Sequence, residues 1–559
     1  MKLRAPALAV ALITAARFAA ADSFDDLARD YWAWRARTQA NNRDDIPRLE
    51  RPDGWTPDWS APAVAGRRRA LAGFEERFRA IDPKPWPIAR QVDYRLIGSA
   101  LARVRWELDL LRSWRRNPSF YLDQTLAALV ETLLPPPPVS AARGATIVRI
   151  LDSFPRTLDA AKANLDQAAG PFTRLALADL ADIRTRVQAA TRDLGPLLSP
   201  ETRKALEVRT EPAIAALESY RAWLEARLPS LPSETAVGRD SYVFFLRNVA
   251  LSPFTPEQLL AMGRQEWERS VAFEAYERQR DAGLPELPIL PDQAAQIVRQ
   301  ERDELAIRAF LEQKGILSVP AWMKHYRYRP VPGYLEALAG FGEWTEFTSP
   351  TRLGEDSTRY IPKPTPSLGY FALSMAQDPR ADMVHEGVPG HYFQMALAWA
   401  HEDPIRRHFY DSGANEGIGF YCEEMLLQAG LFDDSPRTRE MLYSYMRLRA
   451  LRVEVDVKLA LGSFTIEQGA DYLKAAVPMD AGTARQEAAS FASGPGQAIT
   501  YQIGKLQILK FLADARRSQG DAFRLRDFHD FVYRNGNVPI ALQRWEYLGL
   551  RDEIDALDH

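Results

Sequence analysis

The feature that most constrains this chain is a glutamate between two histidines, His385-Glu386-Gly-Val-Pro389-Gly390-His391, in a sequence of 559 residues that holds only seven histidines. Neutral imidazole and carboxylate are borderline ligands that suit Zn²⁺, and a catalytic zinc keeps three protein ligands and one open position. A carboxylate beside the first histidine can take a proton from a water whose pKa the metal has lowered to about 7. The motif predicts a site for one zinc ion, with His385 and His391 as ligands and Glu386 as general base.

The spacing of the two histidines departs from the usual zinc helix. In H-E-x-x-H the ligands are four positions apart and share a helical face, whereas His385 and His391 are six positions apart. On an unbroken helix they would lie about 240° apart around the axis and about 9 Å apart along it. Proline removes a backbone donor and glycine accepts a positive φ, so we expect the helix to break at Pro389-Gly390 and to return His391 to the metal.

A second run, Glu416-Gly-Ile-Gly-Phe-Tyr421-Cys-Glu423, follows 25 residues after His391. Together the two runs resemble the domain-of-unknown-function 885 family, bacterial proteins with H-E-x-x-P-G-H followed by E-G-x-x-x-Y-x-E. The resemblance implies a helical zinc peptidase of the gluzincin kind, such as thimet oligopeptidase or angiotensin-converting enzyme, with Glu416 as third ligand. Glu423 and Glu424, about two turns further along the same expected helix, remain alternatives.

Later stretches also resemble the family. The run from Gly494 to Gly504 matches P-G-Q-A-x-x-Y-x-x-G and contains Gln497 and Tyr501. Tyr501 is our candidate for a hydroxyl donor to the developing oxyanion, because such a donor beside the metal is common. Gln497 is a candidate for binding the substrate backbone, and His529 is a further substrate-binding candidate.

The resemblance also implies a strand beside the zinc helix, to which an extended peptide can add. We expect residues 367–374, with Gly369 and Tyr370 as substrate-binding residues, near that position; a plain connector is the alternative. Two positions depart from the family pattern: Ala460 stands where relatives have a histidine, and Ser490-Phe491 stands where an Arg-Tyr pair is expected.

A second histidine pair, His401 and His408, follows the motif closely. Positions seven apart share a helical face but lie about 10.5 Å apart along it, and Pro404 interrupts the run. We interpret this pair as solvated surface. Partners that orient the zinc-binding imidazoles are expected among Glu423, Asn415 and Asp411.

Periodicity predicts a mainly α fold. Apolar residues recur at helical spacing in the segments 24–41, 64–81, 93–114, 142–168, 256–279, 294–315, 416–430 and 436–460. Segments 326–332 and 347–370 are rich in Pro, Thr, Ser and Tyr, which favours short strands and ordered loops. With the resemblance, this predicts a large two-lobed helical fold with a small β element near the active site.

Composition bounds the rest. Apolar residues make up 46% and charged residues 26% of the chain, as in globular proteins. No linker separates domains, so we expect one domain over 22–559, with an N-terminal helical lobe at 22–320 and a catalytic lobe at 321–559. A net charge of −3 gives no argument for nucleic acid, and the single Cys422 excludes an internal disulfide. We expect a monomer or weak dimer.

The first 21 residues predict a signal peptide. A basic start is followed by the uncharged residues 5–16 and by an A-x-A ending at Ala21. Twelve uncharged residues are too few to span a bilayer; a buried N-terminal helix is the alternative. We therefore expect an exported bacterial protein, periplasmic or secreted, and without a nearby cysteine we expect no membrane anchor after cleavage.

The predicted function is a zinc metallopeptidase that cleaves short peptides. The common zinc aminopeptidases carry a G-A-M-E-N run that this chain lacks, which favours an oligopeptidase or carboxypeptidase. A non-peptide amidase or esterase would use the same metal ligands. A metal-holding but inactive periplasmic binding protein is a further alternative, given Ala460, Ser490 and Phe491.

Overall fold

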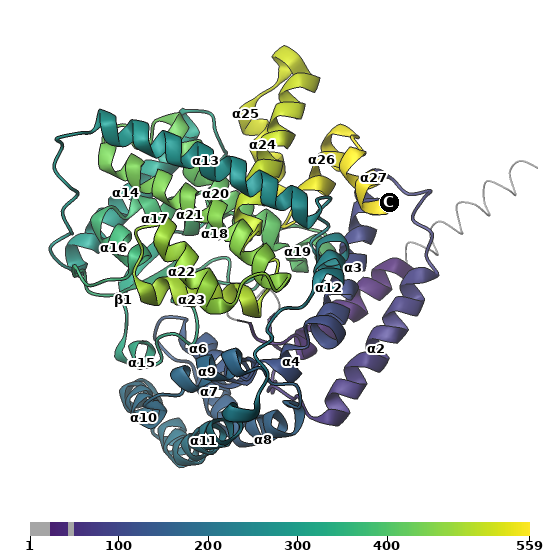
Figure 1. Cartoon of the computed structure of the whole chain (residues 1–559), viewed down its shortest axis with the longest axis vertical. Helices are drawn as coiled ribbons and strands as arrows, with labels where there is room; N and C mark the ends of the chain where they lie inside the picture. Colours follow the sequence, from purple (N-terminus) through teal and green to yellow (C-terminus); the bar gives the residue numbers. More distant parts are fainter. Residues whose placement is uncertain (1–22, 43–49) are drawn as a thin grey trace, which may run out of the picture.

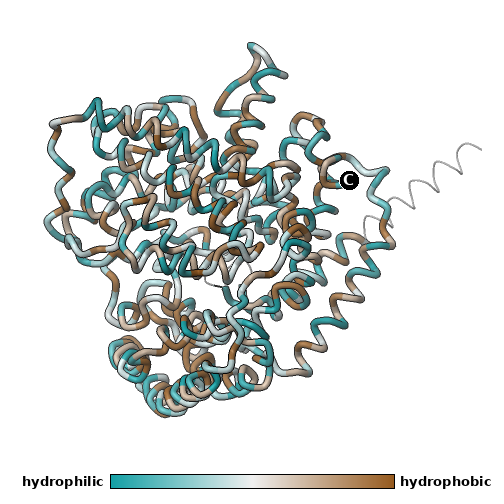
Figure 2. Tube along the Cα trace, viewed as in Figure 1, coloured by the Kyte–Doolittle hydropathy of each residue, from teal (hydrophilic) through white to brown (hydrophobic). Residues whose placement is uncertain are grey.

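The structure is a computed structural model that describes residues 23–42 and 50–559, so the predicted signal peptide lies outside the described residues. The chain is mainly helical and carries a single three-stranded sheet in its described part (Figure 1). The prediction of a mainly α fold with a small β element is confirmed. No helix in the described ranges is long and apolar enough to span a membrane, and Figure 2 shows hydrophobic and hydrophilic residues interleaved along the helices.

The first part of the chain is a group of helices around one hydrophobic core. Residues 23–38 are helical. The longer helices that follow are α2 (Ala61–Arg79), α3 (Ile88–Arg105), α6 (Ala128–Leu133), α7 (Ala141–Asp152), α8 (Phe154–Asn164), α9 (Gly170–Asp179), α10 (Ile183–Leu194) and α11 (Pro200–Arg227). The segment expected as one helix at 142–168 is two helices, because Pro155 at the start of α8 lacks the backbone donor that a continuous helix needs.

The second group contains the motifs. It begins with α12 (Arg239–Phe244), α13 (Pro256–Arg280) and α14 (Gln293–Gln313) and continues, after the sheet, with α16 (Tyr370–Gln377), α17 (Arg380–Glu386), α18 (His391–Trp399), α19 (Pro404–His408), α20 (Ser412–Ala429), α21 (Pro436–Ala460), α22 (Ile466–Ala476), α23 (Ala481–Ser493), α24 (Thr500–Gln519), α25 (Leu525–Arg534), α26 (Ile540–Leu548) and α27 (Asp552–Asp558). Although α13 and α14 precede residue 320, α13 packs along α21 and α14 joins the core around the motif helices. The expected division at residue 320 therefore falls inside one packing unit.

The sheet has strand order β1-β3-β2, with β1 (Tyr326–Pro330) parallel and β2 (Thr345–Glu346) antiparallel to β3 (Ser357–Ile361). A short helix, α15 (Gly333–Glu336), separates β1 from β2. The segment 367–374, expected beside the zinc helix as a strand or connector, is a turn followed by the first residues of α16. Its Tyr-Phe-Ala-Leu run lacks the alternation of a half-buried strand. The edges of the sheet are β1 and β2.

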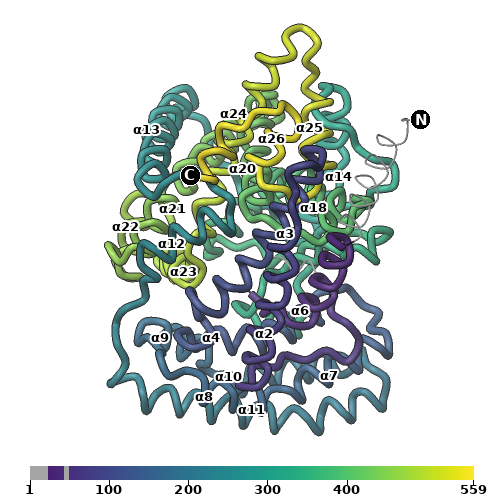
Figure 3. The backbone as a smooth tube through the Cα atoms, turned by 90° about the vertical axis from the view of Figure 1, so that its right-hand side faces the viewer, coloured from purple at the N-terminus to yellow at the C-terminus, as the bar shows by residue number. Residues whose placement is uncertain are grey.

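Helix α3 connects the two groups. Figure 3 shows it running from the lower helices toward α18 and α26. At that end the buried Arg406 of α19 is 2.8 Å from Asp93 of α3 and also contacts Asn535 and Glu546 near α25 and α26. This buried ion pair ties the first group of helices to the second.

Candidate metal centre

The predicted helix break is present. Helix α17 ends at Glu386 and α18 begins at His391. A Cβ on Gly390 would lie 1.7 Å from the carbonyl oxygen of His385, so only glycine fits where the chain doubles back. The φ of Gly390 is −70°, so close backbone approach, and not the positive φ we expected, is what requires glycine.

The break is held by a hydroxyl from another helix. Tyr533 of α25 donates a hydrogen bond of 2.7 Å to the carbonyl of Pro389. The thiol of Cys422, which is buried and free, lies 3.0 Å from the same hydroxyl. The start of α18 is thereby fixed to both α20 and α25.

Helix α20 carries the third side chain, Glu416, and two of its glycines allow the imidazoles and α24 to approach closely. A Cβ on Gly419 would lie 2.9 Å from Cε1 of His391 and 3.0 Å from Cε1 of His385. A Cβ on Gly417 would lie 2.7 Å from Cα of Gly504 on α24. The E-G-x-G run is thus packed against the imidazoles on one side and against the next helix on the other.

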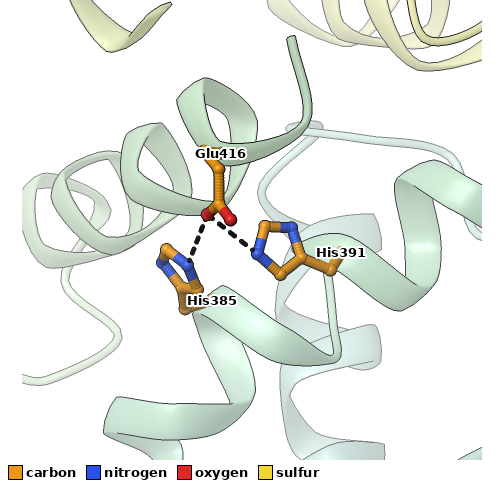
Figure 4. Close-up of side chains that lie close together, drawn as sticks. All are labelled: His385, His391 and Glu416. Atoms are coloured by element: carbon orange, nitrogen blue, oxygen red, sulfur yellow. Dashed lines mark ion pairs between the residues drawn. The ribbon is translucent and has the colours of Figure 1, made fainter. Parts of the chain in front are cut away.

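His385, His391 and Glu416 converge on one point, as Figure 4 shows. Oε2 of Glu416 lies 3.4 Å from Nε2 of His385 and 3.1 Å from Nε2 of His391. Ligands held about 2.0–2.1 Å from a tetrahedral zinc are about 3.4 Å apart, so these separations fit one shared ion. In the described part of the chain this is the one group of three His, Cys, Asp or Glu side chains whose ligand atoms converge in this way.

The cluster is buried, and its electrostatics favour a positive charge. The three residues are 5%, 3% and 7% exposed, and Oε2 of Glu416 accepts no hydrogen bond. Burial opposes the charged forms of both His385 and Glu416. It would lower the pKa of His385, but the carboxylates of Glu416 and Glu423 outweigh it and raise that pKa to about 9. Burial would likewise raise the pKa of Glu416, but His391 and His385 hold it well below its usual range. The charges around the cluster therefore favour a cation at this point.

Glu423 orients one ligand and is not the third ligand. Its Oε1 lies 2.7 Å from Nδ1 of His385, on the ring edge opposite the cluster, and accepts a hydrogen bond of 3.0 Å from Arg449 of α21. Such a carboxylate fixes the ring tautomer and orientation of a metal-binding histidine. The rival Glu424 faces the other way and pairs with Lys505 at 2.7 Å.

The other two expected orienting residues have different roles. Asp411 caps α20 by accepting from the backbone N–H of Ala414, and Asn415 donates to Gln394. Neither of these two contacts is with an imidazole of the cluster. Arg449, which sequence reasoning missed, is one of several arginines on α21, and nothing local in the sequence distinguishes it.

Glu386 lies next to His385 at the end of α17 and is partly accessible. Burial would raise the pKa of its carboxyl, but His391 and the guanidinium of Arg359 outweigh that effect and lower it. Glu386 is therefore ionised at neutral pH. A carboxylate in that state can accept a proton, as a general base must.

Tyr501 stacks on the cluster. Its ring lies 5.9 Å from that of His385 at an interplanar angle of 15°, and Arg452 lies 4.5 Å from its ring centroid on α21. Burial and the Glu416 carboxylate raise the pKa of Tyr501 well above its usual range, so the hydroxyl stays protonated. Arg452 is itself held by Glu487 of α23 through two bonds of 2.7 Å.

The Pro-Gly-Gln turn before Tyr501 is anchored by the buried Asp456. This carboxylate accepts from the backbone N–H of Gly496 at 2.9 Å and of Ala498 at 2.8 Å. Gln497 points toward the start of α20, where its Oε1 accepts from Ser412 at 2.8 Å. The turn thus connects α21 to the helix that carries Glu416.

Three other predicted substrate-binding residues are placed differently. His529 is 1% exposed; its Nε2 contacts the Tyr421 hydroxyl and its Nδ1 the carbonyl of Ile316, both at 2.8 Å. Burial lowers the pKa of His529 to about 4, as for a neutral core residue. Gly369 is exposed at the start of α16, and the Tyr370 hydroxyl is 2.7 Å from that of Ser444.

The departures from the family pattern and the second histidine pair lie away from the cluster. Ala460 is buried among Trp106, Tyr242 and their neighbours, and the Phe491 ring packs 5.7 Å from the Arg452 guanidinium. His401 accepts from the backbone N–H of Asp403, and the ring of His408 packs 5.9 Å from that of Trp32. His401 and His408 thus have separate partners.

Fold and site together define a mainly helical protein with a buried His-His-Glu centre. The chain belongs to the family described as "Bacterial protein of unknown function (DUF885)", which matches residues 38–545. Two solved structures share the fold at 17% sequence identity. For a candidate lipoprotein of unknown function from Shewanella oneidensis the TM-score is 0.65, and the match covers 94% of this chain and 98% of the other. For a candidate lipoprotein from Colwellia psychrerythraea the TM-score is 0.71, and the match covers 96% of this chain and 99% of the other. No curated protein matches.

Proposed function

We propose that this protein is a zinc-dependent hydrolase that cleaves short peptides. The observation that carries the proposal is the convergence of His385, His391 and Glu416, whose ligand atoms lie within 4.8 Å of one another in a buried site. Two imidazoles and one carboxylate are the protein ligands of a catalytic zinc with one open position. The second supporting observation is Glu386, an ionised and partly accessible carboxylate adjacent to the first ligand.

The residues around the cluster supply the remaining parts of an amide hydrolysis. When bound, zinc lowers the pKa of a coordinated water to about 7 and polarises the scissile carbonyl. Glu386 would take the proton of that water and pass it to the leaving amine. The protonated hydroxyl of Tyr501 would donate to the oxyanion, and Arg452 would fix its ring. Glu423 would hold His385 in the tautomer that presents Nε2.

A peptide is the substrate that this surrounding favours. Strand β2 forms one edge of the sheet, and the ring of Phe347, which follows it, lies 6.3 Å from that of His391. An extended peptide can pair with such an edge. The two groups of helices would limit access to short chains, as in the two-lobed gluzincins such as thimet oligopeptidase. We propose a monomer or weak dimer that binds neither nucleic acid nor, after signal cleavage, the membrane.

Replacement of the proposed base tests this function. We expect Glu386→Gln to retain one zinc per chain but to lose peptide turnover by a factor of about 100 or more, because general-base catalysis contributes about 10²–10⁴. Zinc is measured by elemental analysis and turnover by mass spectrometry of a mixed peptide library. Glu402→Gln, at an exposed glutamate beside the other histidine pair, serves as control. Equal turnover in Glu386→Gln would remove the proposed base, and a purified protein without stoichiometric zinc would exclude the enzyme.

The same library separates the peptidase from the other enzyme class with these ligands. A non-peptide amidase or esterase would leave the peptides intact while hydrolysing simple amide or ester substrates in a zinc-dependent way. An inactive binding protein would hold zinc and hydrolyse neither. Neither Ala460 nor Phe491 replaces a metal ligand, which favours the active enzyme; Phe491 packs on Arg452, which also packs on the proposed oxyanion donor Tyr501.

We also propose that the protein is exported. The proposal rests on the basic start, uncharged run and A-x-A ending of residues 1–21. The two structurally similar proteins are described as lipoproteins, which is consistent with an exported family. Detection of the mature chain in the periplasmic or external fraction, with a new N-terminus after Ala21, would test it.

A further inference from the structure

We propose that the carboxylate of Glu343 makes this site selective for short peptides that carry a positive charge, an α-ammonium group or a Lys or Arg side chain, near the bond to be cleaved. The inference rests on the proposed peptidase function and names its substrate class. It starts from the position of Glu343, which the sequence does not mark, and from the charges that surround it.

Glu343 lies on the segment that crosses between the two hydrophobic cores. Phe341 and Trp344 pack in the core of the first group of helices, whereas Phe347 packs in the core of the motif helices. Phe347 also contacts the ring of His391. Between these anchors the side chain of Glu343 is 73% exposed. Its carboxylate therefore projects where the two groups of helices meet, four residues before the Phe347 ring that contacts His391.

The contacts of Arg359 place this carboxylate on the side of the proposed base. Nη1 of Arg359 lies 3.8 Å from Glu343, and Nη2 lies 3.4 Å from Asp382. Asp382 and Glu386 are four residues apart on α17 and share its face. One guanidinium thus connects Glu343 to the face of α17 that carries the proposed base, and Glu386 in turn is adjacent to the ligand His385.

Glu343 is the surplus negative charge among the carboxylates around the metal centre. The other carboxylates have partners: Glu423 pairs with Arg449 at 3.0 Å, Glu487 with Arg452 at 2.7 Å and Asp382 with Arg359 at 3.4 Å. The charges of Glu386 and Glu416 would be balanced by one divalent ion. Among the described residues, the one ion pair of Glu343 is the long contact with the already shared Arg359. A cationic group of the substrate would complete the balance, and an acidic one would be repelled.

Binding of defined peptides tests the inference without turnover. The probes are tetra-alanine amide, its N-acetyl derivative, and the acetylated peptide with one lysine at each position in turn. Calorimetry at pH 6.5, where an α-amino group of pKa about 7.7–8.0 is charged, measures binding to zinc-loaded Glu386→Asp, which keeps the charge at position 386 but shortens the proposed base. We expect a cationic probe to bind about tenfold more tightly than the neutral one, as for a charge-assisted contact. The free amine and the lysine series identify the source of the charge.

The variants at position 343 decide the outcome. Adding Glu343→Gln should reduce the advantage of the cationic probe to less than about twofold, and Glu343→Lys should make the cationic probes bind less tightly than the neutral one. Glu336→Gln, at an exposed glutamate on α15, is the matched control and should change nothing. An unchanged advantage in Glu343→Gln would overturn the inference. Glu343-dependent binding without cleavage by the wild-type protein would instead contradict the proposed peptidase, and cleavage without charge preference would contradict only the inference.

Discussion

At the scale of single residues, His385 lies between two carboxylates, Glu416 on one ring edge and Glu423 on the other. Its pKa of about 9 in the metal-free protein exceeds the ordinary value of 6.5. The protonated imidazole of His385 therefore adds to the free energy of unfolding in full below pH 6.5, and this contribution is lost as the pH rises through 9. Zinc would bind Nε2 of His385 only after the imidazole has lost its proton.

Zinc affinity should consequently depend on pH well above the usual range for histidine. We expect the apparent affinity to fall about tenfold for each unit below pH 9, because one proton must leave His385. Competition with a chelator at pH 7, 8 and 9 measures this slope. In Glu423→Gln the slope should begin at lower pH, since one of the two carboxylates that raise the pKa is neutral. An affinity that is constant over this range would contradict the arrangement.

At the scale of helices, the separation of α17 from α18 decides whether two histidines six positions apart can share an ion. We expect Gly390→Ala to lower zinc affinity by about 100-fold or to prevent folding of the site, because the added Cβ would meet the His385 carbonyl at 1.7 Å. Zinc titration and the melting temperature measure the two effects. Gly73→Ala, in the exposed helix α2 with no atom within 4 Å of the new Cβ, is the control and should be neutral or stabilising. Normal zinc binding by Gly390→Ala would show that the break does not position His391.

Many of the helix boundaries were predictable from the local sequence. The break at Pro389-Gly390 and the helix boundaries at Pro256 and Pro436 follow from chemistry within a few residues, and the structure has them there. Residues 367–374, expected at the strand beside the zinc helix or as a connector, are a turn and the start of a helix, because which segment forms the edge of a sheet depends on distant pairing with β3. Arg449, Arg452 and Glu343 were missed for the same reason: their roles come from helices and loops that only folding brings together.

At the scale of the whole molecule, Arg406 joins the two groups of helices through Asp93, and both residues are buried. We expect Arg406→Ala to lower the free energy of unfolding by about 3 kcal/mol, because it leaves the buried Asp93 with only the longer contact of 3.4 Å to Arg90. Urea denaturation measures this loss. Arg407→Ala, at the adjacent and less buried arginine, should cost less than about 1 kcal/mol. Similar losses in both variants would mean that the pair does not hold the groups together.

The crossing segment also limits how far the molecule can open. Trp344 and Phe347 are anchored in different cores, and the chain between them is already extended as β2. Three residues span at most about 11 Å when fully stretched, so this tether has almost no slack. Any wide hinge motion would pull Phe347 away from His391 and disturb the ligand geometry. For the proposed peptidase, substrate would have to reach the metal centre without such an opening, which favours short peptides over folded proteins.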